Sequence, residues 1–448
     1  MILVKENFDN LEKLVVDTIQ NAVKTKELKL QVLFQKMESE FTRFGFRESS
    51  KDGVKNILLV RLDNVGDFIL TIPAIREVRM NYPSAFITLV VREKVYPVAE
   101  LCPYVNEVLI FEEKLYTNNL MQIFINVTAF AKKFFWRRRY DLGFSFRYWE
   151  DVWHLTSLIM LYIGGAVQRA GYVNSAIQIY RGKILTKETD WSFDLLTHPV
   201  INPKEIVHDC ARSLYIPKSF GLTIRNTNTE FWYGKTDLYI ARQFLGNFGD
   251  GRIKIAAGIG SNEEVRKYPL EKYLSAFKKI VKKGAALVIF GGPSELDNAQ
   301  FLEKNLPEGT VKNFIKYKAG WRVDAAAMSL TDMYIGNMTG ACDVAAALKK
   351  PVIVLSRVAK DREEIFNNEP SETSIYYPWQ TKAIVIQPEH QSEDCVTMPY
   401  HGGCHKKTAH CITQIKPTEI VAAFDKMKSS INTDVKFFDG DFEKFLTR

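Results

Sequence analysis

The stretch ILLVRLDNVGDFILTIPAIREVR, residues Ile57–Arg79, decides the fold class. It begins with a run of apolar β-formers that ends near Arg61, and an acid, Asp67, stands directly after a glycine in the polar loop that follows. The next segment is apolar and typical of a helix, so we expect a helix to begin near Phe68 and to be kinked or restarted at Pro73. A strand, a loop and a helix in succession are the start of a βαβ unit, so this stretch predicts an α/β fold with a parallel sheet.

The same alternation of short apolar runs and helix-length segments extends along the chain. Four runs lie in the first half and four in the second: NILLVRL (56–62), FITLVV (86–91), EVLIF (107–111) and DLGFSF (141–146), then RIKIAAG (252–258), AALVIFGG (285–292), DMYIGN (332–337) and PVIVLS (351–356). A polar stretch at 225–236 separates the two series. We therefore predict two Rossmann-like domains, 55–230 and 231–425, whose ligands bind beyond the carboxyl ends of the strands and in a central cleft.

Both ends of the chain lie outside this alternation. Leu11, Val15 and Ile19 recur at helical spacing, which predicts a helical extension over residues 1–54, for packing or oligomer formation. Residues 426–448 form a tail in this division of the chain. The start has no basic region followed by an apolar stretch, and no apolar run reaches the roughly 18 residues of a spanning helix. The expected compartment is the cytoplasm.

Composition suits a globular protein with an acidic partner. The chain has 448 residues, 46% of them apolar and 25% charged, with a net charge of +8. The positive charge is compatible with phosphate-bearing substrates, nucleic acid or an anionic membrane face. One segment, 131–146, surrounds aromatic residues with five cations. This pattern fits peripheral contact with a membrane, and it equally fits a basic helix end that runs into a strand.

Asp67 has two interpretations from the local sequence. Aspartate is a preferred helix N-cap, so Asp67 could end the loop and begin the helix. A carboxylate at the carboxyl end of a strand could instead accept a proton from an attacking hydroxyl. The two roles are compatible at a strand–helix junction.

Three loops of the second half have the residues that phosphate binding requires. AGIGSN (257–262) contains Ser261, GGPSE (291–295) follows the next strand, and GNMTG (336–340) opens a helix with Asn337, Thr339 and Gly340. Glycine allows a ligand close to the backbone, and amides at a helix start favour an anion. Arg266 and Lys267 follow the first loop and could neutralise a diphosphate, or be a surface pair ahead of a helix. No Walker A sequence and no G-x-G-x-x-G follows a strand, which disfavours an ATPase or a dehydrogenase.

The six cysteines fall into two groups. Cys102, Cys210 and Cys342 are scattered in apolar or helical context and are expected to pack as small hydrophobic residues. The other three cluster with histidines in one segment: His390, Cys395, His401, Cys404, His405, His410 and Cys411. Sulfur and imidazole ligands suit a structural Zn or Fe, whereas packed reduced thiols and a disulfide are the alternatives.

Taken together, these segments resemble family 9 of the glycosyltransferases, the heptosyltransferase type. Residues 57–79 resemble its amino-terminal strand, R-L-x-x-x-G-D loop and T-x-P-A-x-R helix. RKYPLEKYLSAFKKI, LVIFGGPSE, MYIGNMTGACDVAAALKKPVIVLS and HGGCHKKTAHCITQIKPTEIVAAF resemble its later segments in the family's order. The resemblance covers roughly residues 55–425.

This resemblance implies a GT-B fold and an inverting sugar transfer that needs no catalytic metal or other cofactor. Asp67 matches the general base, Arg266 or Lys267 the diphosphate-binding cation, and Thr339 with Gly340 the phosphate-binding Thr-Gly. The implied partners are an ADP-heptose-like nucleotide-sugar donor and a glycan or lipid-linked acceptor, such as a lipopolysaccharide precursor at the inner face of the cytoplasmic membrane, and no nucleic acid. A protein acceptor such as an adhesin, or a non-catalytic nucleotide-sugar-binding protein, are the alternatives.

The chain departs from the family pattern in the donor loop. Met338 stands where the family has Asp, and Asp343 stands where it often has His. Met338 removes a polar contact expected for ADP-heptose, so the sequence leaves the donor sugar and its base open.

Overall fold

The chain forms two compact units, each built around one parallel sheet. The computed structural model describes residues 2–25, 30–43, 45, 47–48, 53–148, 151–173, 178–180, 183–185, 195–365, 370–392 and 406–429. The described residues of unit 1 fall in Met1–Ile206 and Cys210–Thr227, and those of unit 2 in Val207–Asp209 and Asn228–Asp441. Each unit is considered by itself.

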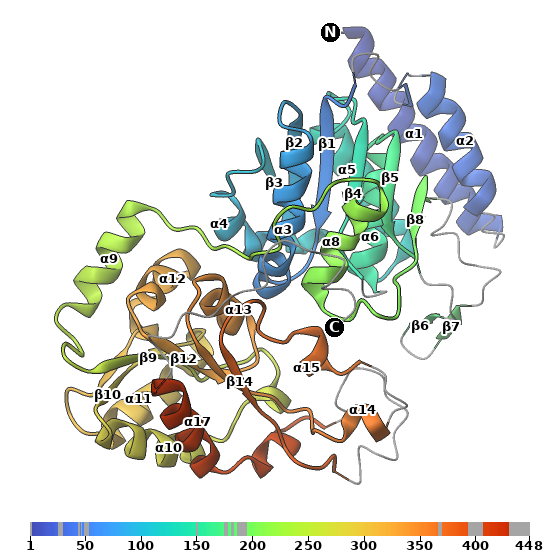
Figure 1. Ribbon diagram of the computed structural model, residues 1–448. Coiled ribbons are helices and arrows are strands. Elements are labelled where there is room, and N and C mark those ends of the chain that lie inside the picture. Colours follow the sequence, from blue (N-terminus) through green and yellow to red (C-terminus); the bar gives the residue numbers. More distant parts are fainter. Residues whose placement is uncertain are drawn as a thin grey trace. The chain divides into compact units, whose positions relative to one another are not determined.

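Unit 1 has a six-stranded sheet in the order β3-β2-β1-β4-β5-β8 (Figure 1). Its strands are β1 (Asn56–Arg61), β2 (Phe86–Arg92), β3 (Glu107–Phe111), β4 (Leu142–Ser145), β5 (Gln168–Tyr172) and β8 (His198–Val200). A small hairpin, β6 (Gln178–Tyr180) and β7 (Lys183–Leu185), lies outside this sheet. The helices are α1 (Ile2–Thr25), α2 (Leu30–Arg43), α3 (Val65–Asn81), α4 (Tyr96–Ala99), α5 (Leu120–Phe134), α6 (Val152–Ile163) and α8 (Asp209–Ser219).

Unit 2 has a sheet in the order β11-β10-β9-β12-β13-β14. Its strands are β9 (Ile253–Gly258), β10 (Ala285–Phe290), β11 (Val311–Asn313), β12 (Met333–Asn337), β13 (Val352–Leu355) and β14 (Ala383–Ile386). Its helices are α9 (Lys235–Leu245), α10 (Leu270–Lys282), α11 (Leu296–Asn305), α12 (Trp321–Ser329), α13 (Gly340–Ala347), α14 (Arg362–Ile365), α15 (Glu372–Ile375) and α17 (Pro417–Lys428).

The two sheets follow the same plan. Numbered within each unit, both have the strand order 3-2-1-4-5-6, which is the order of a Rossmann sheet. Both also use one carboxylate to join the first strand to the fourth at the amino edge. Asp141, just before β4, accepts the Asn56 N–H at 2.9 Å, and Asp332, just before β12, accepts the Lys254 N–H at 2.7 Å. The prediction of a doubly wound α/β architecture is therefore confirmed.

The helical extension packs on the core of unit 1. Leu11 and Val15 of α1 and Met37 and Phe41 of α2 are fully buried and belong to the core that α5 and α6 also line. Their helical spacing in the sequence reflects this contact. Leu11 and Val15, two residues of the apolar face that the sequence identified, are thus covered within the same chain.

Charged side chains fasten α2 to the sheet. Glu38 accepts two bonds from Arg47, at 2.8 and 2.9 Å, and lies 3.6 Å from Arg169 of β5. The Arg47 guanidinium also covers the ring of Phe41, 4.6 Å from its centroid. Burial alone would raise the pKa of Glu38, but the hydrogen bond and the charges of both arginines lower it below its usual value.

Helix α3 begins earlier than predicted and does not restart at Pro73. It begins at Val65, three residues before the expected start, with Asn64 as the N-cap. Asp67 is therefore the third helical residue and not the N-cap. Pro73 lies inside the helix, which continues to Asn81 without restarting.

The carboxyl half of α3 holds the chain segment that leads to unit 2. Glu77 is 1% exposed and accepts the N–H groups of Arg225 at 2.8 Å and Asn226 at 3.1 Å. Asn81 donates to the Thr223 carbonyl at 2.8 Å and accepts its N–H at 3.0 Å. The segment is thus fixed to α3 up to two residues before the second part of unit 2 begins at Asn228.

The basic and aromatic segment 131–146 follows the simpler of its two interpretations. It spans the end of α5 and the start of β4, and the aromatic side chains Phe135, Trp136, Tyr140 and Phe144 are at most 3% exposed. Buried rings of this kind belong to the core. None of the helices described has the length and apolar character to cross a membrane.

Candidate active site

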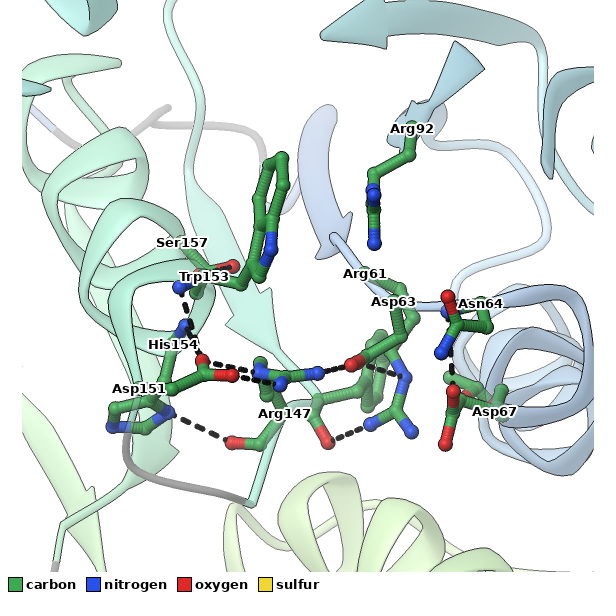
Figure 2. Close-up of polar contacts among 12 residues, drawn as sticks. Arg61, Asp63, Asn64, Asp67, Arg92, Arg147, Asp151, Trp153, His154 and Ser157 are labelled. Atoms are coloured by element: carbon green, nitrogen blue, oxygen red, sulfur yellow. Dashed lines mark hydrogen bonds and ion pairs between the residues drawn. The ribbon is translucent and has the colours of Figure 1, made fainter. Parts of the chain in front are cut away.

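Asp67 lies in the first turn of α3, directly beyond the carboxyl end of β1 (Figure 2). Its Oδ2 accepts the backbone N–H of Asn64 at 3.1 Å, and its carbonyl accepts the hydroxyl of Thr71 at 2.8 Å. The side chain is half-buried. The hydrogen bond from Asn64 fixes the orientation of the carboxylate while leaving it accessible, as a proton acceptor requires.

A neutral ion network stiffens the loop that carries Asp67. Arg61 and Asp63 are 2% and 3% exposed, and the Arg61 Nε lies 2.9 Å from the Asp63 Oδ2. Asp63 also pairs with Arg147, which donates from Nε to Asp151 at 2.8 Å (Figure 2). Two arginines and two aspartates thus join the ends of β1 and β4 to the start of α6.

Asp151 and His154 complete this network at α6. The Asp151 carboxylate caps the helix by accepting the N–H groups of Trp153 and His154, both at 3.0 Å. The buried His154 ring lies with Nδ1 3.0 Å from the Arg147 carbonyl (Figure 2). Arg147 is thus held at its guanidinium by Asp151 and Asp63 and at its carbonyl by His154, which fixes its position at the carboxyl edge of the sheet.

Two further cations line the same edge of the sheet. Arg92 covers the ring of Trp153, 4.3 Å from its centroid, and pairs with Glu113 at 2.8 Å. Burial and the charge of Arg92 lower the pKa of Lys94, against the opposing charges of Glu113 and Asp67. Arg92 is thus paired with a carboxylate, as Arg61 and Arg147 are, and Lys94 is a cation whose charge interacts with that of Asp67.

In unit 2, Asn337 joins the loops that the sequence singled out. It is fully buried at the end of β12. Its Oδ1 accepts from the Tyr268 N–H at 3.2 Å and the Tyr273 hydroxyl at 2.9 Å, and its Nδ2 donates to the carbonyls of Ile259 and Gly260 at 3.1 and 3.2 Å. All of its polar atoms are used within the protein, so Asn337 positions these loops.

The Thr-Gly pair lies at the start of α13. Thr339 is the N-cap residue, and Gly340 is the first residue of the helix. Thr339 is half-buried. Burial raises the pKa of the neighbouring Tyr334 hydroxyl, which donates to the Asn337 carbonyl at 3.3 Å, and the Thr339 side chain acts in the opposite direction. In the loop after β9, the Ser261 hydroxyl accepts the Glu263 N–H at 3.2 Å. Both loops lie beyond the carboxyl ends of adjacent strands, β9 and β12.

The two predicted cations are already paired with carboxylates. Arg266 lies 2.8 Å from Glu372 and 3.2 Å from Glu263. Lys267 lies 2.6 Å from Glu264 and 3.2 Å from Glu295, which is 3% exposed. Burial acts to lower the pKa of Lys267, but the hydrogen bonds to both glutamates raise it above its usual value.

Three functional candidates in unit 2 were missed by the sequence reasoning. Arg357 follows β13 and forms two contacts to Glu372, at 2.8 and 2.7 Å, so Glu372 links Arg357 to Arg266. Arg357 could have been found, because it follows a predicted strand as the other three loops do. Burial raises the pKa of Asp324, in the first turn of α12, to about 7. Neither Asp324 nor Glu372 has a signal in the sequence, since their environments depend on distant residues.

The cysteines divide as expected where the structure describes them. Cys102, Cys210 and Cys342 are at most 6% exposed, which confirms their packing in apolar surroundings. Cys411 is 3% exposed, whereas Cys395 and Cys404 lie outside the described residues, as do His401 and His405. Within the described parts of the chain, no group of three or more His, Cys, Asp or Glu side chains could hold a metal ion. A metal at this cluster stays a prediction.

Comparison with known proteins identifies the fold. No protein-family model matches the chain, and no curated protein sequence matches it. Among solved structures, a glycosyl transferase family 9 protein from Veillonella parvula DSM 2008 matches with a TM-score of 0.63 and 19% identity, over 83% of this chain and 97% of that one. The E. coli ADP-heptose lps heptosyltransferase II matches with a TM-score of 0.57 and 16% identity, over 83% and 98%.

A third structure, E. coli heptosyltransferase WaaC with ADP, matches with a TM-score of 0.53 and 14% identity, over 84% of this chain and 98% of that one. At sequence identities this low, these structural matches establish a common fold and nothing further. The two Rossmann-type sheets, the position of Asp67 after the first strand and these three matches agree with one another. The chain therefore has the two-domain GT-B fold of the family 9 glycosyltransferases.

Proposed function

We propose that the protein is an inverting glycosyltransferase that moves a sugar, heptose or a related one, from a nucleotide-diphosphate donor to a hydroxyl group of an acceptor. The observation that carries the proposal is Asp67, a half-buried carboxylate held by the Asn64 N–H at the carboxyl end of β1. The fold, which it has in common with heptosyltransferases, supports the reaction class.

In this reaction Asp67 would act as general base. Its carboxylate would accept the proton of the acceptor hydroxyl while the hydroxyl oxygen forms a bond to the anomeric carbon of the donor sugar. The bond between that carbon and the diphosphate oxygen would break, and the nucleoside diphosphate would leave with its electron pair. Attack opposite the leaving group inverts the anomeric configuration.

Unit 2 would hold the donor. Thr339 and the first amides of α13 would bind the diphosphate, and Arg266 and Lys267 would supply positive charge. Both cations are ion-paired in the structure, so binding would exchange a carboxylate partner for a phosphate. Ser261 and Asn337 would act by fixing the loops beside them.

The acceptor would be a cell-surface glycan precursor of the lipopolysaccharide type, reached at the inner face of the cytoplasmic membrane. The net charge of +8 supports an anionic partner of this kind. A protein acceptor such as an adhesin, and a non-catalytic role in nucleotide-sugar binding, are the rival functions.

A thermal-shift screen of the full-length protein with ADP-, GDP-, UDP- and CMP-sugars tests the proposal. We expect one class to raise the melting temperature, because a ligand that binds only the folded state stabilises it. Transfer from that donor to a glycolipid precursor should then be measurable. No shift with any nucleotide sugar would refute the donor, and a shift without transfer to any glycan or protein would favour the non-catalytic function.

A further inference from the structure

Arg212 is a buried cation that forms no ion pair with the residues that the structure describes. It lies in α8 and is 4% exposed. Its Nε donates to the Ile206 carbonyl at 3.2 Å, but its Nη1 is buried and has no hydrogen-bond partner. No carboxylate among the described residues pairs with it.

The other buried arginines of unit 1, unlike Arg212, are paired with carboxylates. Within the described residues, Arg61 pairs with Asp63, Arg76 with Glu77, and Arg169 with Glu38. A buried charge is costly unless it is paired, and a guanidinium cannot lose its proton to avoid that cost. Arg212 therefore has the properties of a binding group whose partner is a separate molecule.

The surroundings of Arg212 form a built site. The Tyr148 ring covers the guanidinium, with its centroid 3.8 Å from Cζ, and the Tyr172 ring meets Tyr148 edge-on at 5.2 Å. The Tyr172 hydroxyl donates to the Arg212 carbonyl at 2.7 Å. A guanidinium stacked on its face still presents its edge N–H groups, which match the paired oxygens of a phosphate or carboxylate.

The site also adjoins the candidate base. Ser213, next to Arg212, lies with Oγ 3.3 Å from the Thr71 hydroxyl, which donates to the Asp67 carbonyl. Tyr148 and Tyr172 come from the ends of β4 and β5, at the same edge of the sheet where β1 leads to Asp67.

We propose that Arg212 and Tyr148 form a binding site for an oxyanion, a phosphate or a carboxylate group. The proposal that an oxyanion binds here rests only on the contacts of Arg212. Its assignment to a charged group of the sugar acceptor, which it would position near Asp67, rests on the proposed function.

Melting temperatures of the full-length protein, titrated with inorganic phosphate and separately with acetate at constant ionic strength, test the site. Wild type should be stabilised by one of them, and the larger shift identifies the source as phosphate or carboxylate. Arg212→Met keeps the side-chain length without the charge. It should lose at least nine-tenths of the shift, and without added anion it should melt no lower than wild type, because an unpaired buried charge has been removed.

Arg242→Met, at an exposed arginine of α9, is the control for non-specific anion binding, and it should keep the shift. Arg212→Lys carries the test if Arg212→Met does not fold, and it should bind the anion about tenfold more weakly because the guanidinium fork is lost. The proposal is overturned if wild type does not respond, or if Arg212→Met or Arg212→Lys responds undiminished. It is also overturned if Arg242→Met abolishes the shift, or if Arg212→Met folds but melts lower than wild type. Failure of the nucleotide-sugar screen would leave these results unaffected, so the two proposals fail separately.

Discussion

At the residue scale, Asp67 combines a local structural role with a predicted chemical one. Asp67→Asn retains an oxygen that can accept the Asn64 N–H, so the helix start should survive. The amide cannot accept the proton of a hydroxyl, so we expect turnover to fall by about 10²–10⁴-fold. Donor affinity, measured by calorimetry, should stay within a few-fold of wild type.

A matched control is available in unit 2. Asp237 is the third residue of α9 and accepts the Gly234 N–H at 2.7 Å, the same contact that Asp67 makes in α3. Asp237 also lies 3.5 Å from Arg322, so Asp237→Asn should lower stability at least as much as Asp67→Asn and leave turnover unchanged. Near-normal turnover in Asp67→Asn would mean that the residue only stabilises the start of α3.

The hydroxyl of Thr339 separates donor binding from folding. Thr339→Val has nearly the same volume but no hydroxyl, and we expect about tenfold weaker donor binding in a titration, as for loss of one hydrogen bond to a charged group. Thr339→Ser keeps the hydroxyl and should restore the affinity. Equal affinity in all three proteins would move the diphosphate away from the start of α13.

At the element scale, the sequence predicted what local pattern determines. Strands buried on both faces appear as apolar runs, so four of the six strands of each sheet were located in the sequence. The strands β5, β8, β11 and β14 were not predicted. The start of α3 was misplaced because Asn64 and Asp67 are both capable cap residues, and the observed backbone uses Asn64. The pairing of Asp63 with Arg147 joins residues far apart in the sequence, and such a contact leaves no local signal.

The contact between α2 and the sheet should depend on pH. The pKa of Glu38 is lowered in the folded protein from its usual 4.5, so its stabilising contribution is present above about pH 4.5 and lost as the pH falls through the lowered value. Hydrogen exchange of α2 should therefore accelerate on acidification in that window. Glu38→Gln should remove this dependence, whereas Glu40→Gln, on the same helix, should keep it. An identical pH profile in Glu38→Gln would show that another group controls the contact.

At the scale of the whole molecule, the two units should respond to different ligands. A nucleotide sugar should slow hydrogen exchange in the loops that follow β9, β10 and β12, because donor binding is predicted there. Phosphate should slow exchange in α8, around Arg212. Both patterns can be measured by mass spectrometry on one protein preparation. Protection of unit 1 alone by the nucleotide sugar would contradict the assignment of the donor to unit 2.

The candidate site was predictable where residues act through their own loop, and not where they act through distant partners. Asp67 and Thr339 stand in short motifs after strands, so the sequence located them. Asn337 was expected to meet the donor, yet each of its polar atoms is used by another loop of unit 2. Arg212 could not be found, since its lack of an ion pair with any carboxylate of the described residues is a property of the folded chain.

Helix α3 carries both the candidate base and the residue that holds the connecting segment. Its first turn carries Asp67, and Glu77, ten residues later, holds the chain that continues into unit 2. Ten residues of helix span about 15 Å. Asp67 and Glu77, which holds the connecting segment, thus lie on one continuous helix with no loop between them. A substitution of Glu77 would therefore release the Arg225 and Asn226 N–H groups from the helix that carries Asp67, while Asp67 itself stayed unchanged.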